Sequence, residues 1–128
     1  MQNDYKDKRK SERFKIPNAK VRYKKTSLLR TRDSLSAASP LLNLSTGGMA
    51  FKTKEKFNHN ESILVQLMIP KEPSLSLRAS VKWQGNADSS GTRFIGVKFM
   101  PFRNKSGLNT LESLNVLKRL EKQYTNKE

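Results

Sequence analysis

The sequence contains no cysteine and only one histidine among its 128 residues. The lack of cysteine excludes disulfides, thiolate zinc sites and cysteine nucleophiles, and it fits a reducing compartment. The single histidine, His59, falls in the polar stretch from Phe57 to Glu61, where a histidine is typically a surface residue. The acidic residues form no close pair suited to acid/base chemistry, and no glycine-rich nucleotide loop is present. We therefore expect no enzyme activity, no metal site and no cofactor.

Long apolar segments are also missing. The N-terminus, MQNDYKDKRK, lacks the apolar core of a signal peptide. The longest apolar-leaning run, Ile63 to Pro70, is too short to span a bilayer. These features predict a cytoplasmic protein without a membrane span. The length predicts one domain, and an apolar content of only 34% predicts that part of the chain is tail or loop.

Basic residues dominate the charge, with 26 Lys and Arg against 11 Asp and Glu, a formal net charge of +15. Such a surface attracts anions, which include nucleic acid, anionic lipid, nucleotides and acidic proteins. The excess is concentrated at one end, because residues 1–32 hold 12 basic and 3 acidic residues. Residues 1–12 are polar without periodicity, and we expect a flexible basic arm there.

Several short segments alternate apolar and polar residues, which is the pattern of half-buried β-strands separated by turns. The first begins at Phe14 and changes phase at Pro17, and another places Trp83 in phase with the inward-facing Val81. The alternating segments are residues 14–23, 41–51, 63–69, 75–83 and 95–99. This pattern predicts a small barrel or sandwich over residues 13–104.

Leucines recur at helical spacing near the end of the chain. They lie at every third position from Leu108 to Leu120, and Ser106 is a candidate N-cap. We expect a C-terminal helix over residues 105–124. Leucines that recur at every third residue are displaced around the helix axis by roughly 60° per step. One end of the stripe can therefore cover the barrel while the other end faces a partner.

Two local motifs contain side chains suited to binding a nucleotide. Arg9 and Arg13 lie four apart at the border of the arm and the first strand. Arginine binds phosphate and guanine through its planar fork of donors and stacks on rings. In the second motif, Asn43 and Ser45 are two apart, so on a strand they share a face and could contact one base edge. Gly48 allows close backbone approach or a positive φ.

The order and context of these motifs resemble the PilZ domain family. That family has Arg-x-x-x-Arg before its first strand and Asp/Asn-x-Ser-x-x-Gly on a following strand. Arg9 and Arg13 match the first motif, and Asn43, Ser45 and Gly48 match the second, so no position of the ligand motifs departs from the pattern. Further similarity lies in residues 81–83 and 96–99, so the resemblance extends from about Arg9 to Phe99.

The resemblance implies a mainly β fold, a six-stranded antiparallel PilZ-type β-barrel with a C-terminal helix. It also implies a ligand, the second messenger cyclic di-GMP. Arg9 and Arg13 would hold phosphate and guanine, and the Asn43, Ser45 and Gly48 motif would hold a guanine on the barrel surface.

Three further residues are considered as possible members of this implied site. Arg93 is a candidate contact at its border, whereas we place Trp83 in the core or at the rim and not in the stack. In this family a basic residue at the position of Lys8 is associated with binding two intercalated ligands.

Two other functions compete with a cyclic di-GMP receptor. A basic β-barrel can bind nucleic acid, but most aromatic residues fall on the inward parity, so we expect no nucleic-acid partner. A PilZ-like adaptor would bind a protein alone, but such domains typically lack the arginine pair. We expect the receptor to act on a downstream protein that the sequence does not identify.

Overall fold

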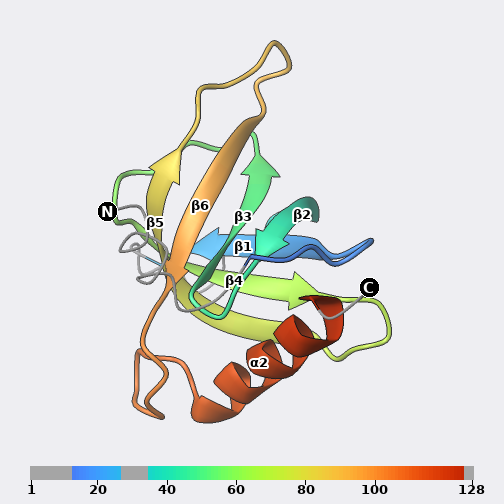
Figure 1. The fold of residues 1–128 in the computed structure, drawn as a ribbon. Coiled ribbons are helices and arrows are strands. Elements are labelled where there is room, and N and C mark those ends of the chain that lie inside the picture. The colour runs from blue at the N-terminus through green and yellow to red at the C-terminus, as the bar shows by residue number, and fades with distance from the viewer. Residues whose placement is uncertain (1–12, 27–34, 126–128) are drawn as a thin grey trace, which may run out of the picture.

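The computed structural model describes residues 13–26 and 35–125, and these residues form six strands and one helix. The strands are β1 (Lys20–Lys25), β2 (Ser39–Leu44), β3 (Gly48–Thr53), β4 (Ser62–Met68), β5 (Leu75–Gln84) and β6 (Arg93–Phe99), and the helix is α2 (Leu111–Thr125). All strand pairs are antiparallel, and the order β1-β2-β3-β6-β5-β4 closes into a barrel (Figure 1). The predicted six-stranded barrel with a C-terminal helix is confirmed. The predicted arm, residues 1–12, lies outside the described residues.

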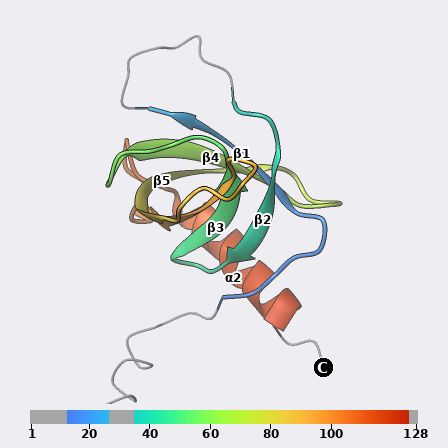
Figure 2. The ribbon, with the colours of Figure 1, turned by 90° about the horizontal axis from the view of Figure 1, so that it is seen from above.

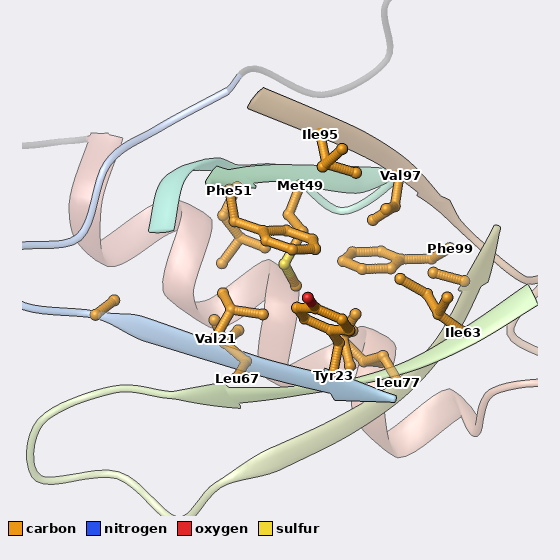
Figure 3. Close-up of a cluster of buried hydrophobic side chains, with 14 of the residues drawn as sticks. Val21, Tyr23, Met49, Phe51, Ile63, Leu67, Leu77, Ile95, Val97 and Phe99 are labelled. Carbon is orange, nitrogen blue, oxygen red and sulfur yellow. The ribbon is translucent and has the colours of Figure 1, made fainter. Parts of the chain in front are cut away.

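The barrel core is built from the inward positions of all six strands. Val21, Tyr23 and Phe51 converge there with residues of β4, β5 and β6 (Figure 3). The alternation predicted for residues 63–69 and 95–99 is confirmed, because Ile63, Val65, Leu67 and Ile69 are buried, as are Ile95, Val97 and Phe99. Burial of apolar side chains at this periodicity fixes which strand face points outward, and therefore which side chains a ligand can reach.

Helix α2 lies across one end of the barrel (Figures 1 and 2). Its leucine stripe turns as predicted, because Leu117 and Leu120 are fully buried whereas Leu111 is 46% exposed. The predicted start at residue 105 is wrong. The helix begins at Leu111, and the Thr110 hydroxyl caps it by accepting a hydrogen bond from the Ser113 amide at 3.1 Å.

The residues between β6 and α2 form a loop in place of the predicted first helical turns. Gly107 has a positive φ of 81°, which interrupts the helical conformation. The Asn109 side chain fixes the loop to the barrel by accepting from the Arg78 amide at 2.7 Å and donating to the Arg78 and Met100 carbonyls. The repeat of leucines therefore gave a helical signal across a segment that the glycine breaks.

The chain enters the barrel through a turn that separates Phe14 from β1. Phe14 and Ile16 are buried as predicted, but they precede the strand, because a turn at Pro17 and Asn18, with φ 64° at Asn18, lies between. Phe14 instead forms a two-bond antiparallel bridge with Leu44, with both N–O distances 2.8 Å. Its ring stacks on Tyr124 of α2.

In the part of the chain that the structure describes, no helix has both the length and the apolar character needed to cross a bilayer.

The Tyr23 hydroxyl is the main polar group within the core. Its oxygen lies 2.6 Å from Thr53 Oγ1, and it donates to Glu55 Oε1 at 2.8 Å. Burial raises the pKa of Tyr23 to about 12, and the Glu55 carboxylate also raises this pKa, while the hydrogen bond with Thr53 acts against the shift. The phenol therefore stays protonated in the folded protein at any physiological pH.

Replacing Tyr23 by Phe tests the contribution of this hydroxyl. We expect Tyr23→Phe to lower the free energy of unfolding by about 1–2 kcal/mol, because a buried pair of hydrogen bonds is lost. Urea unfolding followed by circular dichroism measures it. Since the folded pKa is raised, the unfolded state ionises first as the pH rises above the ordinary value of 10.0. The difference in free energy of unfolding between wild type and Tyr23→Phe should therefore shrink above that pH. If the variant is as stable as wild type at pH 7, the Tyr23 hydroxyl does not contribute the expected stability.

Candidate functional site

A groove of about 290 Å³ lies on the outside of the barrel where the β2–β3 turn meets β5 and β6. It brings together residues that are far apart in the sequence, and three of them, Arg13, Ser45 and Gly48, belong to the two predicted motifs. Its full lining is Arg13, Ser45, Gly47, Gly48, Met49, Lys82, Trp83, Gly96, Val97 and Lys98. The described lining residues include three cations and no carboxylate, so the groove favours an anion.

Arg13 reaches the second motif directly. Its guanidinium donates a hydrogen bond to Asn43 Oδ1 at 3.3 Å, across thirty positions of sequence. The neighbouring Phe14–Leu44 bridge fixes the backbone beside this contact. Arg13 is exposed, so its remaining donors face the groove and solvent. The arrangement brings one arginine of the first motif to the asparagine of the second.

Ser45 organises the turn between β2 and β3. Its hydroxyl oxygen accepts hydrogen bonds from the amides of Gly47 at 3.1 Å and Gly48 at 3.2 Å, and the Ser45 amide donates to the Gly48 carbonyl at 2.8 Å. The residue is largely buried. Its hydroxyl is therefore used inside the turn, whereas the sequence analysis assigned it to a base edge.

Gly48 lies where β3 and β6 approach closely. A Cβ added at this position would be 2.1 Å from the Val97 carbonyl oxygen, so no side chain fits without movement of backbone. The φ of Gly48 is not positive, which leaves close approach as the reason for glycine. This contact between the two backbones forms part of the groove floor.

Trp83 occupies a different face from the one the alternation predicts. The register of β5 and β6 shifts between Val81 and Trp83, so a β-bulge reverses the alternation after Val81. Trp83 therefore points outward and is 46% exposed. Its indole lies against Gly96, where an added Cβ would be 2.1 Å from Cε2 of the ring. Of the two positions expected for Trp83, the core is wrong, whereas a place at the barrel surface fits the exposed indole, which forms an open aromatic surface in the groove wall.

The other predicted site residues are less closely grouped. Arg93 lies at the start of β6, outside the groove lining, and donates a hydrogen bond to the Gly85 carbonyl at 3.3 Å. Its Nε is buried without a hydrogen-bond partner. Lys8 and Arg9 lie outside the described residues. Their assignment, like that of Arg93, stays a prediction.

Sequence reasoning missed three lining side chains, Lys82, Trp83 and Lys98. The two lysines are single charges in a basic chain and carry no distinguishing signal. A larger hollow of about 540 Å³ lies at Tyr23, Lys52 and Asp88, but its lining contains none of the predicted site residues that the structure describes. We assign the site to the smaller groove because the two motifs meet there.

The model of the PilZ domain family matches residues 7–115, which is most of the chain. The chain belongs to the PilZ domain family. No curated protein matches it.

Several solved structures share the fold. The PilZ domain of YcgR from Escherichia coli, solved with c-di-GMP, has a TM-score of 0.63 and 15% identity, covering 91% of this chain and 90% of that one. The inhibitor of motility MotI (DgrA) of Bacillus subtilis has a TM-score of 0.61 and 17% identity over 90% of this chain and 49% of that one. MrkH of K. pneumonia in its apo state has a TM-score of 0.63 and 14% identity over 88% and 47%. The chain thus spans about half the length of MotI and MrkH.

The two glycines of the β2–β3 turn offer a matched test of the groove floor. We expect Gly48→Ala to destabilise the protein by roughly 1–3 kcal/mol, because the new methyl meets backbone. Gly47→Ala should stay within about 0.5 kcal/mol of wild type, since the nearest atom to its Cβ is Ser45 Oγ at 3.9 Å. Chemical denaturation of the two variants measures the difference. Equal stabilities contradict the close approach.

Proposed function

We propose that the chain is a receptor for cyclic di-GMP and that the groove at Arg13 is its binding site. The single observation that carries the proposal is the meeting of the two motifs, where Arg13 donates to Asn43 beside the Ser45–Gly48 turn. Family membership supports it, as do the solved structures of YcgR and MrkH with c-di-GMP. The role is binding and not catalysis.

The groove offers the chemistry that a cyclic dinucleotide requires. The ligand is a dianion with two flat purines, so it needs cations, forked donors and an apolar surface for a ring. Arg13, Lys82 and Lys98 supply the positive charge. The Arg13 fork suits a phosphate or the acceptor edge of guanine, and the Trp83 indole offers a face for stacking. In this arrangement Ser45 acts by shaping the turn, and Asn43 by orienting Arg13.

Arg9 completes the phosphate contacts in this proposal. Four residues of chain span at most about 14 Å, so Arg9 stays within reach of a ligand bound at Arg13. Lys8 would add a cation beside it and favour two intercalated ligands per chain. Both assignments rest on the sequence motif, and calorimetry of the Arg9→Ala and Lys8→Leu variants examines them by affinity and by stoichiometry.

We further propose that the ligand carries the signal by fixing residues from about Lys6 to Arg13 against the barrel. The Phe14–Leu44 bridge already holds the end of this segment next to the groove. A dianion between the arm's arginines and the barrel offsets the repulsion among like charges. The arm, ligand and barrel would then form one surface that a downstream partner prefers.

The binding prediction uses a pair of arginine variants. Wild type should bind cyclic di-GMP with a micromolar or lower Kd, and Arg13→Ala should weaken binding by roughly 10-fold to 150-fold, because a charge-assisted contact of about 1.5–3 kcal/mol is lost. Arg22→Ala removes an exposed arginine from β1, outside the groove, and should bind like wild type. Calorimetry with GTP as the competing nucleotide measures all three.

Two results would count against this assignment. The absence of binding heat at about 100 µM wild-type protein would overturn the receptor proposal. If Arg13→Ala and Arg22→Ala lose the same affinity for cyclic di-GMP, the effect of Arg13 is one of net charge and not of a specific contact.

The signalling prediction is a change in amide exchange. Amides of residues 8–13 should exchange more slowly once cyclic di-GMP is added, because the ligand ties them to the barrel. The amides of β4, which lies away from the groove lining, should change little and serve as the internal reference. Hydrogen exchange read by mass spectrometry measures both. Protection of residues 8–13 that is already complete without ligand would mean a preformed site and would refute the ordering step.

A further inference from the structure

The charge of the barrel wall is of one sign. The six strands contain nine lysines and arginines and no aspartate or glutamate. The acidic residues of the described chain lie in loops and in α2, such as Glu55, Glu72 and Glu112. Since inward strand positions are apolar, most of these cations lie on the outer face of the barrel. The groove assigned to cyclic di-GMP occupies only one end of that face.

Two large aromatic side chains are exposed on the same outer face. Phe94 is 49% exposed and Trp83 is 46% exposed. Phe94 and Gly96 are two apart on β6 and therefore share a face, and the Trp83 indole lies against Gly96. The strands β3, β6 and β5 that carry this face lie side by side (Figure 1). The two rings thus lie on one outward face of the barrel, with Phe94 beyond the groove.

Lysines of β3, β5 and β6 lie on or next to the strands that carry these rings. Lys52 pairs with Phe94 across β3 and β6, and its Nζ lies 5.5 Å from the centroid of the phenyl ring. Lys98 lies on the same face of β6 as Phe94, and Lys82 directly precedes Trp83. We call Lys52, Lys82, Trp83, Phe94 and Lys98 the outer track. The distance along β6 from Phe94 to Lys98, four residue steps, is roughly 13 Å. A stacked nucleic-acid strand advances about 3.4 Å per nucleotide.

We propose that the outer track binds single-stranded nucleic acid. Open aromatic faces within a field of lysines are what unpaired bases and their phosphates require. A duplex keeps its bases stacked inside and cannot use the rings, and an acidic protein would need the lysines alone. A base that stacks on Phe94 displaces the Lys52 ammonium, which is then free to contact a phosphate. Most described aromatic side chains are buried, as the sequence predicted, and the proposal rests on the two that are exposed.

The proposal does not rest on cyclic di-GMP binding, although Lys82, Trp83 and Lys98 belong to both sites. For that reason a Trp83 substitution cannot separate them, and Phe94 is the diagnostic position because it lies outside the groove lining. Trp83 is the only tryptophan of the chain, so its fluorescence reports directly on stacking.

The experiment titrates the full chain into fluorescein-labelled oligo-dT and oligo-rU of about twelve nucleotides, a length within the usual site sizes. A duplex of the same length is the comparison. We expect both single strands to bind more tightly than the duplex, to quench Trp83, and to bind more weakly as salt rises. Duplex binding as tight as single-strand binding, or a complex without quenching, overturns the proposal in favour of charge attraction alone.

Matched variants locate the contacts. Phe94→Leu keeps an apolar side chain but removes the ring, and should weaken oligo-dT binding roughly tenfold, whereas Phe94→Tyr should retain it. Lys52→Gln should weaken binding more than Lys118→Gln, which removes one exposed charge from α2. Thermal unfolding of each variant shows that the barrel is intact.

The two proposals fail separately. Phe94→Leu should bind cyclic di-GMP like wild type. If this variant binds oligo-dT like wild type, the outer track is wrong while the receptor proposal stands. If wild type binds oligo-dT as expected but gives no heat with cyclic di-GMP, the receptor proposal fails and the outer track stands.

Discussion

The short seam between β1 and β2 is the constraint on which the site depends. β1 pairs with β4 over six residues but with β2 only at Lys20 and Val21. The rest of the β2 edge would present unpaired amides and carbonyls, which is costly near a core. The chain supplies the missing partner from just before β1, where Phe14 exchanges two hydrogen bonds with Leu44. Closing the barrel therefore places Arg13 next to Asn43.

This seam explains how Arg13 comes to lie beside the motif on β2. The turn at Pro17 and Asn18 lets the segment before β1 run alongside β2, and burial of Phe14 between the barrel and Tyr124 holds it there. The segment is anchored at Phe14 before any ligand arrives. Less conformational freedom is then lost on binding than with an arm that is free along its whole length.

Predictions that rest on the spacing of apolar residues were correct where that spacing is regular. They were wrong where a single residue interrupts it. Inward positions such as Ile63 and Val97 were predicted correctly because burial repeats every two residues. Trp83 was misplaced because the bulge at its own position leaves no sign in the alternation. The helix start was misplaced because Leu108 continues the leucine spacing upstream of the true helix. The positive φ of Gly107 keeps this segment out of the helical conformation.

The motif at Asn43, Ser45 and Gly48 illustrates a second limit. Its spacing points to the groove proposed as the site, but not to the structural roles of its members. Ser45 directs its hydroxyl to two turn amides, and Gly48 is required by the Val97 carbonyl, so both residues shape the surface that they line. A motif can therefore be recognised from residue types while the division between shaping and contacting groups depends on strand register.

The role of Trp83 follows from the same logic of register. The bulge that turns it outward and the glycine beneath it at position 96 act together, because any side chain there would displace the indole. One exposed indole borders both the groove and the outer track, and one ring face can stack on a single base at a time. Occupancy of the groove by a guanine would therefore remove the aromatic surface on which a nucleic-acid strand depends. Because both proposed ligands use Trp83, cyclic di-GMP and the single-stranded nucleic acid would exclude each other without any change of fold.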